Sequence, residues 1–411
     1  MTFSSSSNTN TNLYLFTTSQ IPLPIKYPHP RKPILVLPSL IHRSLHNSLD
    51  GETPSFLIQQ QEGSNTKGKE TIIIPHPDNL IKHDLPPLQT STSTSTISGS
   101  NDEIEKEDKK NEHPSKPTET QVNGEIDGIG LSDSSANYLI DSELTVKLHL
   151  IGGDDDHSST STGIENDDSA KYLEWIKESL NVLTKYKGLN GKQIDNFLIG
   201  FKGLDYRGSK TKASEMFGCG SEGLEAPNTE SISDTVLEKS ILNTFSHLIQ
   251  DQNDSNSIII NEKTKLGSLY STLDLLKQLV SLKQNNPNKG IKVNALDTPD
   301  CHHLPKEYTN YAKENGIELW AGGGGEGSDP LPSNHLHNLL QEFSSKISDL
   351  TNEKINSLQN QIPLREDGLK FDSEKVKSSV DVKWVLSYTL VSKTRNVVKD
   401  KGYIVSANFT A

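Results

Sequence analysis

The stretch SAKYLEWIKESLNVLTKYKGLNGKQIDNFLIGF, residues 169–201, decides the fold class. Its first part repeats apolar side chains at helical spacing, namely Tyr172, Leu173, Ile176, Leu180 and Leu183. Its last part, residues 194–201, is a short apolar run that is typical of a buried strand. A similar run, LTVKLHLI, precedes the helix at residues 144–151. A strand, a helix and a second strand in this order predict parallel strands joined by a crossover helix.

The same alternation extends along the rest of the chain. Further helices are predicted at residues 234–250, 267–284, 305–315 and 334–350. Further strands are predicted at residues 13–16, 34–37, 71–74, 257–261, 291–296 and 316–320. Residues 384–392 are expected to hold a helix end and a last parallel strand, and 396–407 a hairpin that turns at Asp400–Gly402. About eight strands interleaved with helices predict an α/β protein of the (β/α)8 TIM-barrel type, with an open doubly wound sheet as the alternative.

Low-complexity sequence divides the chain. Residues 89–128, from QTSTSTSTISGS onward, offer scarcely an apolar side chain to bury, so they are predicted to be a disordered insert. We therefore expect a disordered tail at 1–12, an N-terminal part of the barrel at 13–88, the insert at 89–135 and the main barrel body at 136–411.

Composition limits the possible functions. Hydrophobic residues make up 32% of the 411 residues, and the formal net charge is −13. A negative field of this size opposes binding to nucleic acid and to anionic membranes. The chain has two cysteines, which indicates a reducing compartment, and a cytoplasmic location is the expectation. The first 49 residues lack acidic side chains, which would suit a transit peptide, but the prolines at positions 22, 24, 28, 30 and 33 oppose the amphipathic helix that this would need.

Three segments, in order, resemble one known family. They are NPNKGIKVNAL (286–296), YTNYAKENGIEL (308–319) and WVLSYTLVSKTRNVVKDKGYIVSA (384–407). They resemble the regulatory (modifier) subunit of glutamate–cysteine ligase, a catalytically silent relative of the aldo-keto reductase barrel. The resemblance covers residues 136–411, with a looser match at 13–82. It implies an aldo-keto reductase type of barrel that binds the catalytic ligase subunit, raises its affinity for glutamate and relieves feedback inhibition by glutathione.

The same resemblance lets the sequence be tested for reductase chemistry. A reductase of this type uses a Tyr as proton donor, a Lys and an Asp that tune it, a His and a nicotinamide cofactor. Lys147 ends a predicted strand where the reductases place their Lys; we read it as a structural lysine at that vestigial position, with a catalytic remnant as the alternative. Gly200 stands where they place the His, and Asp133 and Tyr138 lie too near Lys147 in sequence to form the reductase unit. An NADPH-dependent aldo-keto reductase is thus the alternative, and no catalytic residue is predicted.

The glycine-rich segment ELWAGGGGEGSDP, residues 318–330, follows a predicted strand end, where such barrels hold a cofactor pyrophosphate. It lacks the Lys–Ser/Thr pair that ends the Walker pattern, and Glu326 and Asp329 add negative charge. We expect no cofactor, with residual NADPH binding as the alternative. The histidine pairs in CHH (301–303) and HLH (335–337) are too small to predict a metal site.

Two further features point to a partner. The basic residues near the C-terminus are predicted to contact an acidic surface of the ligase, together with an aromatic anchor; the set is Lys393, Arg395, Lys399, Lys401 and Tyr403. The alternative is a solvated hairpin face. Cys301 follows a predicted strand in a loop and is a possible redox-reactive thiol.

Overall fold

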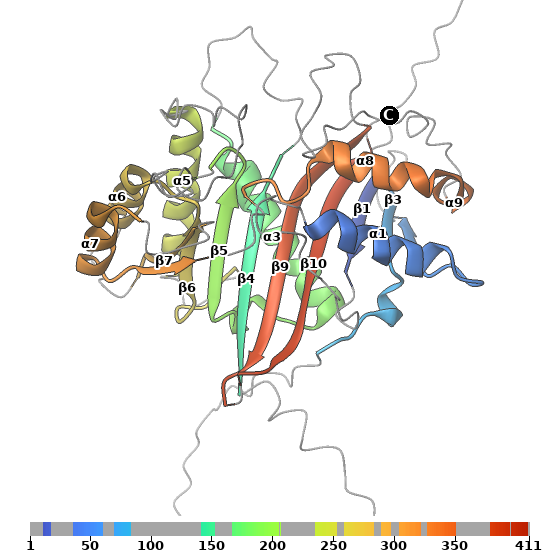
Figure 1. Ribbon diagram of the computed structural model, residues 1–411, viewed down its shortest axis with the longest axis horizontal. Helices are drawn as coiled ribbons and strands as arrows, with labels where there is room; N and C mark the ends of the chain where they lie inside the picture. The colour runs from blue at the N-terminus through green and yellow to red at the C-terminus, as the bar shows by residue number, and fades with distance from the viewer. Residues whose placement is uncertain are drawn as a thin grey trace, which may run out of the picture.

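One ten-stranded mixed sheet organises the described residues of the chain in the computed structural model (Figure 1). The structure describes residues 11–17, 36–60, 70–83, 141–152, 167–204, 206, 235–252, 259–282, 289–296, 304–321, 327–350, 379–394 and 396–409. The strands are β1 (Thr11–Phe16), β2 (Leu57–Gln60), β3 (Glu70–Ile74), β4 (Ser142–Leu150), β5 (Asn196–Phe201), β6 (Lys265–Leu269), β7 (Ile291–Leu296), β8 (Glu318–Ala321), β9 (Val380–Ser392) and β10 (Val398–Phe409).

The strand order is β2-β3-β1-β10-β9-β4-β5-β6-β7-β8. Strands β4 to β8 run parallel, whereas β9 is antiparallel to both β4 and β10, and β10 is antiparallel to β1. The predicted α/β class is confirmed, but the described strands form an open sheet with β2 and β8 at its edges, so the closed (β/α)8 barrel is wrong for them. The physical reason is that the long β9–β10 hairpin pairs with β1 on one side and β4 on the other, which carries the chain away from β8.

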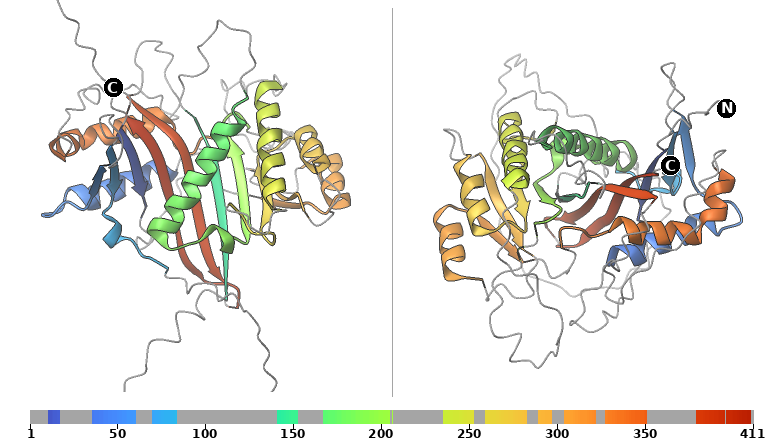
Figure 2. Two further views of the ribbon diagram at one scale, coloured as in Figure 1. Left: turned by 180° about the vertical axis from the view of Figure 1, so that it is seen from behind. Right: turned by 90° about the horizontal axis from the view of Figure 1, so that it is seen from above.

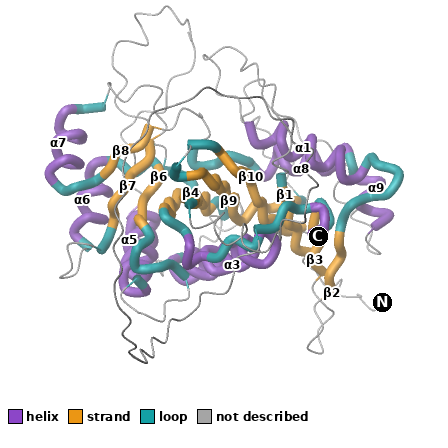
Figure 3. The backbone as a smooth tube through the Cα atoms, turned by 90° about the horizontal axis from the view of Figure 1, so that it is seen from below, coloured by secondary structure: helices purple, strands orange, loops and turns teal. Residues whose placement is uncertain are grey.

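Helices cover the sheet on both sides (Figures 2 and 3). The helices are α1 (Val36–Leu49), α3 (Ser169–Lys187), α5 (Thr235–Asp251), α6 (Leu273–Ser281), α7 (Lys306–Glu314), α8 (Ser333–Glu342) and α9 (Ser344–Leu350), with short 3-10 turns η1 (Pro77–Asn79) and η3 (Gly191–Gln193). Helices α3, α5, α6 and α7 share one apolar core with the sheet, and we call that side of the sheet the α3 face. Helices α1, α8 and α9 pack on the opposite side, which we call the α8 face.

Alternation along β4 explains how the sheet is placed between the layers. Leu144, Val146 and Leu148 point to the α3 face and join its core, whereas Lys147 and His149 point to the α8 face. Helix α3 ends at Gly188, which adopts the left-handed conformation (φ 68°) and donates its N–H to the carbonyl of Thr184. The predicted strand–helix–strand unit is therefore confirmed.

Several local predictions were wrong. Residues 34–37 were predicted as a strand, but α1 begins at Val36, because Leu37, Ile41 and Leu45 are buried at helical spacing. The strand predicted at 257–261 is replaced by β6, which lies a few residues later. The helix predicted at 267–284 is shorter in the structure, where α6 spans Leu273–Ser281. Residues 396–407 were predicted to form a hairpin by themselves, but from Val398 onward they belong to the single strand β10; the hairpin in the structure joins β9 to β10 and turns between Ser392 and Val398. Asp400 lies inside β10, and β9 is antiparallel where a parallel strand was predicted.

The predicted domain limits remain a prediction. Strand β1 begins at Thr11 and pairs directly with β10 of the predicted main body. The N-terminal part and the main body therefore share one sheet. The predicted insert, 89–135, lies outside the described residues.

Candidate functional site

The position where a reductase would carry its histidine is closely packed. Gly200 lies on the α8 face of β5, beside His149 of β4. A Cβ atom added to Gly200 would stand 3.1 Å from the Cβ of Leu269 and 3.5 Å from Nδ1 of His149. The geometry therefore leaves little room at Gly200 for any side chain.

His149 is a residue that the sequence analysis missed, although it interrupts the apolar run LTVKLHLI. It is 1% exposed, and its Nδ1 has no hydrogen-bond partner among the described residues. Burial, and to a smaller extent the charge of Lys147, lowers the pKa of His149 to about 3, so the imidazole is neutral at physiological pH. Its ring lies 6.1 Å from that of Tyr270, a residue with a positive φ of 60°. Lys147, His149 and Tyr270 thus lie close together in a part of the sheet where His149 and Tyr270 are buried.

Because His149 is buried in its neutral form, we expect the folded protein to lose stability in acid. Its pKa is lower in the folded chain than the ~6.5 expected of the unfolded chain, so its contribution to stability is complete above that value and falls as the pH decreases. Between about pH 7.5 and about pH 5.5, this group alone should cost roughly 1.4 kcal/mol of unfolding free energy. Urea unfolding at the two pH values checks this. His149→Phe should remove that part of the pH dependence, whereas His247→Gln, at an exposed site of α5, should retain it. Parallel pH dependences in wild type and His149→Phe would contradict the assignment.

The β9–β10 hairpin divides the predicted partner residues into two groups, and the first group lies near its turn. Lys393 donates to Oδ1 of Asp195 at 3.2 Å, and Lys399 donates to Oγ of Ser142 at 2.7 Å, so both ammonium groups are held against the end of the sheet. Arg395 lies outside the described residues.

The remaining partner residues share the α8 face with Lys147. Ser387 of β9 pairs with Tyr403 on one side and with Lys147 on the other, and Thr389 pairs with Lys401 in the next row. Residues paired in this way project on the same side of a sheet. The structure therefore brings Lys147, Lys401 and Tyr403, which are far apart in sequence, into one patch, which we call the lysine–tyrosine patch. At the hairpin turn nearby, Val397 and Val398 are about half exposed.

A second group of reductase-like residue types lies elsewhere. Oδ2 of Asp400 is 3.0 Å from Nζ of Lys187 and 2.9 Å from Nε2 of His83, and it accepts a 3.3 Å hydrogen bond from Tyr388. Lys187 and Asp400 are only 3% and 2% exposed. Burial and the nearby Asp400 raise the pKa of Tyr388 well above its usual value, while burial lowers the pKa of Lys187 against the opposing effect of Asp400. These side chains join β9, β10, α3 and the segment after η1, so their role is to hold the sheet and α3 together.

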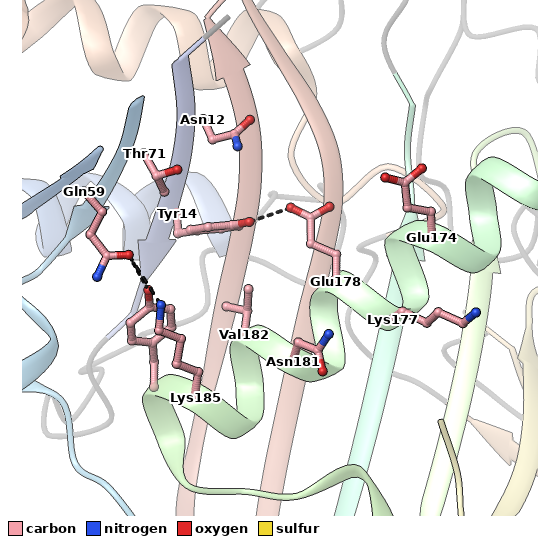
Figure 4. A pocket seen from close by; sticks show the side chains of 11 residues that line it. Asn12, Tyr14, Gln59, Thr71, Glu174, Lys177, Glu178, Asn181, Val182 and Lys185 are labelled. Atoms are coloured by element: carbon pink, nitrogen blue, oxygen red, sulfur yellow. Dashed lines mark hydrogen bonds between the residues drawn. The ribbon is translucent and has the colours of Figure 1, made fainter. Parts of the chain in front are cut away.

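Figure 4 shows the pocket between α3 and strands β1 to β3, with a volume of ≈ 760 Å³. The sequence analysis missed it, because its walls come from distant segments. Asn12 and Tyr14 of β1, Gln59 of β2 and Thr71 of β3 form one wall. The other wall is α3, through Glu174, Lys177, Glu178, Asn181, Val182, Lys185 and Tyr186.

The carboxylate of Glu178 accepts three hydrogen bonds at this pocket. Tyr14 donates to its Oε1 at 2.6 Å, Ser406 donates to the same atom at 3.5 Å, and Trp384 donates to its Oε2 at 3.3 Å. Burial and the charge of Glu178 raise the pKa of Tyr14 far above its usual value, so its hydroxyl remains a donor. The pocket thus contains a carboxylate held by three neutral donors.

Other predicted features are only partly placed. Cys301, Asp133, Tyr138 and the glycines of 322–325 lie outside the described residues. In the described part of the glycine-rich segment, Asp329 is 3.6 Å from Nζ of Lys202. No cluster of His, Cys, Asp or Glu within the described residues could hold a metal ion. Nor does any helix of the described ranges combine the length and the apolar character that crossing a membrane requires.

No protein-family model matches the chain, and neither does any curated protein or solved structure with which it was compared. The resemblance of the three sequence segments therefore remains a prediction.

Proposed function

We propose that this chain is a non-catalytic regulatory subunit of glutamate–cysteine ligase in the cytoplasm. It binds the catalytic subunit, raises its affinity for glutamate and relieves its feedback inhibition by glutathione. The observation that carries the proposal is the C-terminal segment 384–407, the most specific part of the resemblance, which forms the β9–β10 pair near the middle of the sheet order.

The lysine–tyrosine patch, which joins β10 of this hairpin to Lys147 of β4, is our proposed contact surface. Lys401 is exposed and Tyr403 is half-buried, so both are accessible to a partner. Tyrosine is one of the residues that most often carry the binding energy of protein interfaces, and the lysines beside Tyr403 favour an acidic partner surface. Lys393 and Lys399, whose ammonium groups are already held, contribute less in this proposal.

The alternative function is NADPH-dependent aldo-keto reduction, for which the cluster of Lys147, His149 and Tyr270 is the relevant observation. A carbonyl substrate would have to reach His149, which is 1% exposed, and that burial favours the regulatory proposal. Quenching of NADPH fluorescence and turnover of a simple aldehyde distinguish the two: a reductase shows both at enzyme-like rates.

The decisive experiment mixes the purified chain with the catalytic ligase subunit and measures ligase activity against glutamate concentration. We expect a stable complex and a lower KM for glutamate. Lys401→Glu combined with Tyr403→Ala should raise the Kd of the complex by about tenfold or more, because these side chains are the proposed anchors.

The control for charge is Lys313→Glu, which makes the same reversal at an exposed site of α7, near the β8 edge of the sheet. It should leave the Kd within about twofold of wild type, since a remote surface charge contributes little. A complex that forms equally well with both variants would refute the contact surface. The absence of any complex, or of any effect on KM, would refute the proposed function itself.

A further inference from the structure

A row of polar side chains crosses the α3 face beside the pocket of Figure 4. Strand register aligns Gln59 with Thr71, Thr71 with Asn12, and Asn12 with Asn408. The row therefore passes over β2, β3, β1 and β10 in a part of the sheet where neighbouring rows are largely apolar. Asn12 and Thr71 are each 8% exposed, so this row is polar although it is mostly buried.

Two acceptors in this row have no partner. Oδ1 of Asn12 and Oδ1 of Asn408 are both buried, and neither receives a hydrogen bond from the described residues. A buried carbonyl oxygen without a donor costs on the order of 1–3 kcal/mol, which a ligand that supplies the donor would recover. Asn12 also lines the pocket, so a ligand in the pocket can reach its side chain.

The donors on the floor of the pocket are already engaged. Tyr14, Trp384 and Ser406 all donate to Glu178, which fixes the carboxylate and leaves it as an acceptor. The acceptors Asn12 and Glu178 remain for a ligand. The cations Lys177 and Lys185 are exposed on α3, and Lys185 lies over the ring of Tyr186 and donates to Gln59. The floor thus favours a molecule that brings N–H donors and positive charge.

We propose that this pocket is a binding site for a small primary amine. Its ammonium group would donate to Oδ1 of Asn12 and to the carboxylate of Glu178, and the ring of Tyr14 would add a cation–π contact. An amide next to the amine would suit the remaining polar side chains, Thr71 and Gln59. This site is separate from the lysine–tyrosine patch, which lies on the α8 face, so the two proposals fail independently.

The test titrates the full chain with three small probes of different charge: glycinamide, N-acetylglycinamide and propionate. Calorimetry or ligand-observed NMR gives each Kd. Glycinamide should bind at least about tenfold more tightly than the other two, because a charge-assisted hydrogen bond is roughly twice as strong as a neutral one. Failure of glycinamide to bind, or equal binding of glycinamide and its acetylated form, would overturn the proposal.

Two variants locate the site. Glu178→Gln removes the negative charge and keeps the size of the side chain, and it should weaken glycinamide binding by about tenfold or more. Asn12→Asp places a charge at the unpartnered acceptor and should tighten glycinamide binding, a gain that unfolding does not mimic. Glu342→Gln, the matched loss of charge at an exposed site of α8, should leave the Kd unchanged. An unaltered Kd in Asn12→Asp, or the same change in Glu178→Gln and Glu342→Gln, would also overturn the proposal.

Discussion

Replacing Asp400 with alanine is expected to lower the free energy of unfolding by about 3–5 kcal/mol. The change leaves the ammonium group of Lys187 buried without its carboxylate, 3.0 Å away in the wild type, and removes the acceptor of Tyr388. An uncompensated buried charge costs more than the ion pair itself contributes, because neither water nor a counter-charge solvates it. Chemical denaturation followed by circular dichroism measures the loss.

The control is Glu307→Ala, which breaks a pair with Lys277 at 3.2 Å between side chains that are 41% and 74% exposed. Solvent already screens that pair, so the expected loss is far smaller than that of Asp400→Ala. Combining Asp400→Ala with Lys187→Met should recover part of the stability, since the second change removes the unpaired charge. If Asp400→Ala were no more harmful than Glu307→Ala, the buried network would not hold the fold together.

Gly188→Ala should also destabilise strongly, by about 2–5 kcal/mol. Gly188 ends α3 with a φ of 68°, and a Cβ atom there would stand 2.3 Å from the carbonyl oxygen of His83. The atom in the way belongs to the backbone and cannot rotate aside as a side chain can. The backbone of His83 is also fixed by the hydrogen bond from its N–H to the carbonyl of Lys187 at 2.8 Å. The chain must therefore separate at this point to accept a methyl group.

Gly316 offers a matched comparison. It follows α7 with a φ of 65°, and an added Cβ would meet nothing within 4 Å. Gly316→Ala should therefore cost only the left-handed backbone penalty, about 1–2 kcal/mol. The difference between the two variants measures the clash with His83. Equal losses, read from urea unfolding curves, would show that the contact between α3 and the segment after η1 yields easily.

Local patterns predicted the parts of the fold that local forces decide. The apolar spacing in 169–187 gave the limits of α3, and β4, β5 and β7 lie within a few residues of their predicted places. Short apolar runs were less informative: 34–37 became the start of α1, because four residues do not distinguish a helix from a strand. The direction of β9 was also wrong, since parallel and antiparallel strands share the same local composition.

The candidate sites depended on contacts that no local pattern encodes. Lys147 was predicted to end a strand, but it lies inside β4, and its place beside Ser387 and in the row of Tyr403 follows from strand register. The pocket joins Tyr14 of β1 to Glu178 of α3, two side chains that are 164 positions apart in the sequence. Neither residue stands in a motif, so nothing in the sequence marked them.

By itself, the sequence determined the α/β class, the places of most helices and strands, and the acidic charge of the chain, because periodicity and composition are local properties. Tertiary structure alone decided that the sheet is open and that Asp400 meets Lys187 and His83. It also decided that Asn12 and Glu178 line one pocket. The physical reason is that pairing of β1 with β10 and of β4 with β9 is a choice among many nearly equivalent partners, which only the packing of the whole chain resolves.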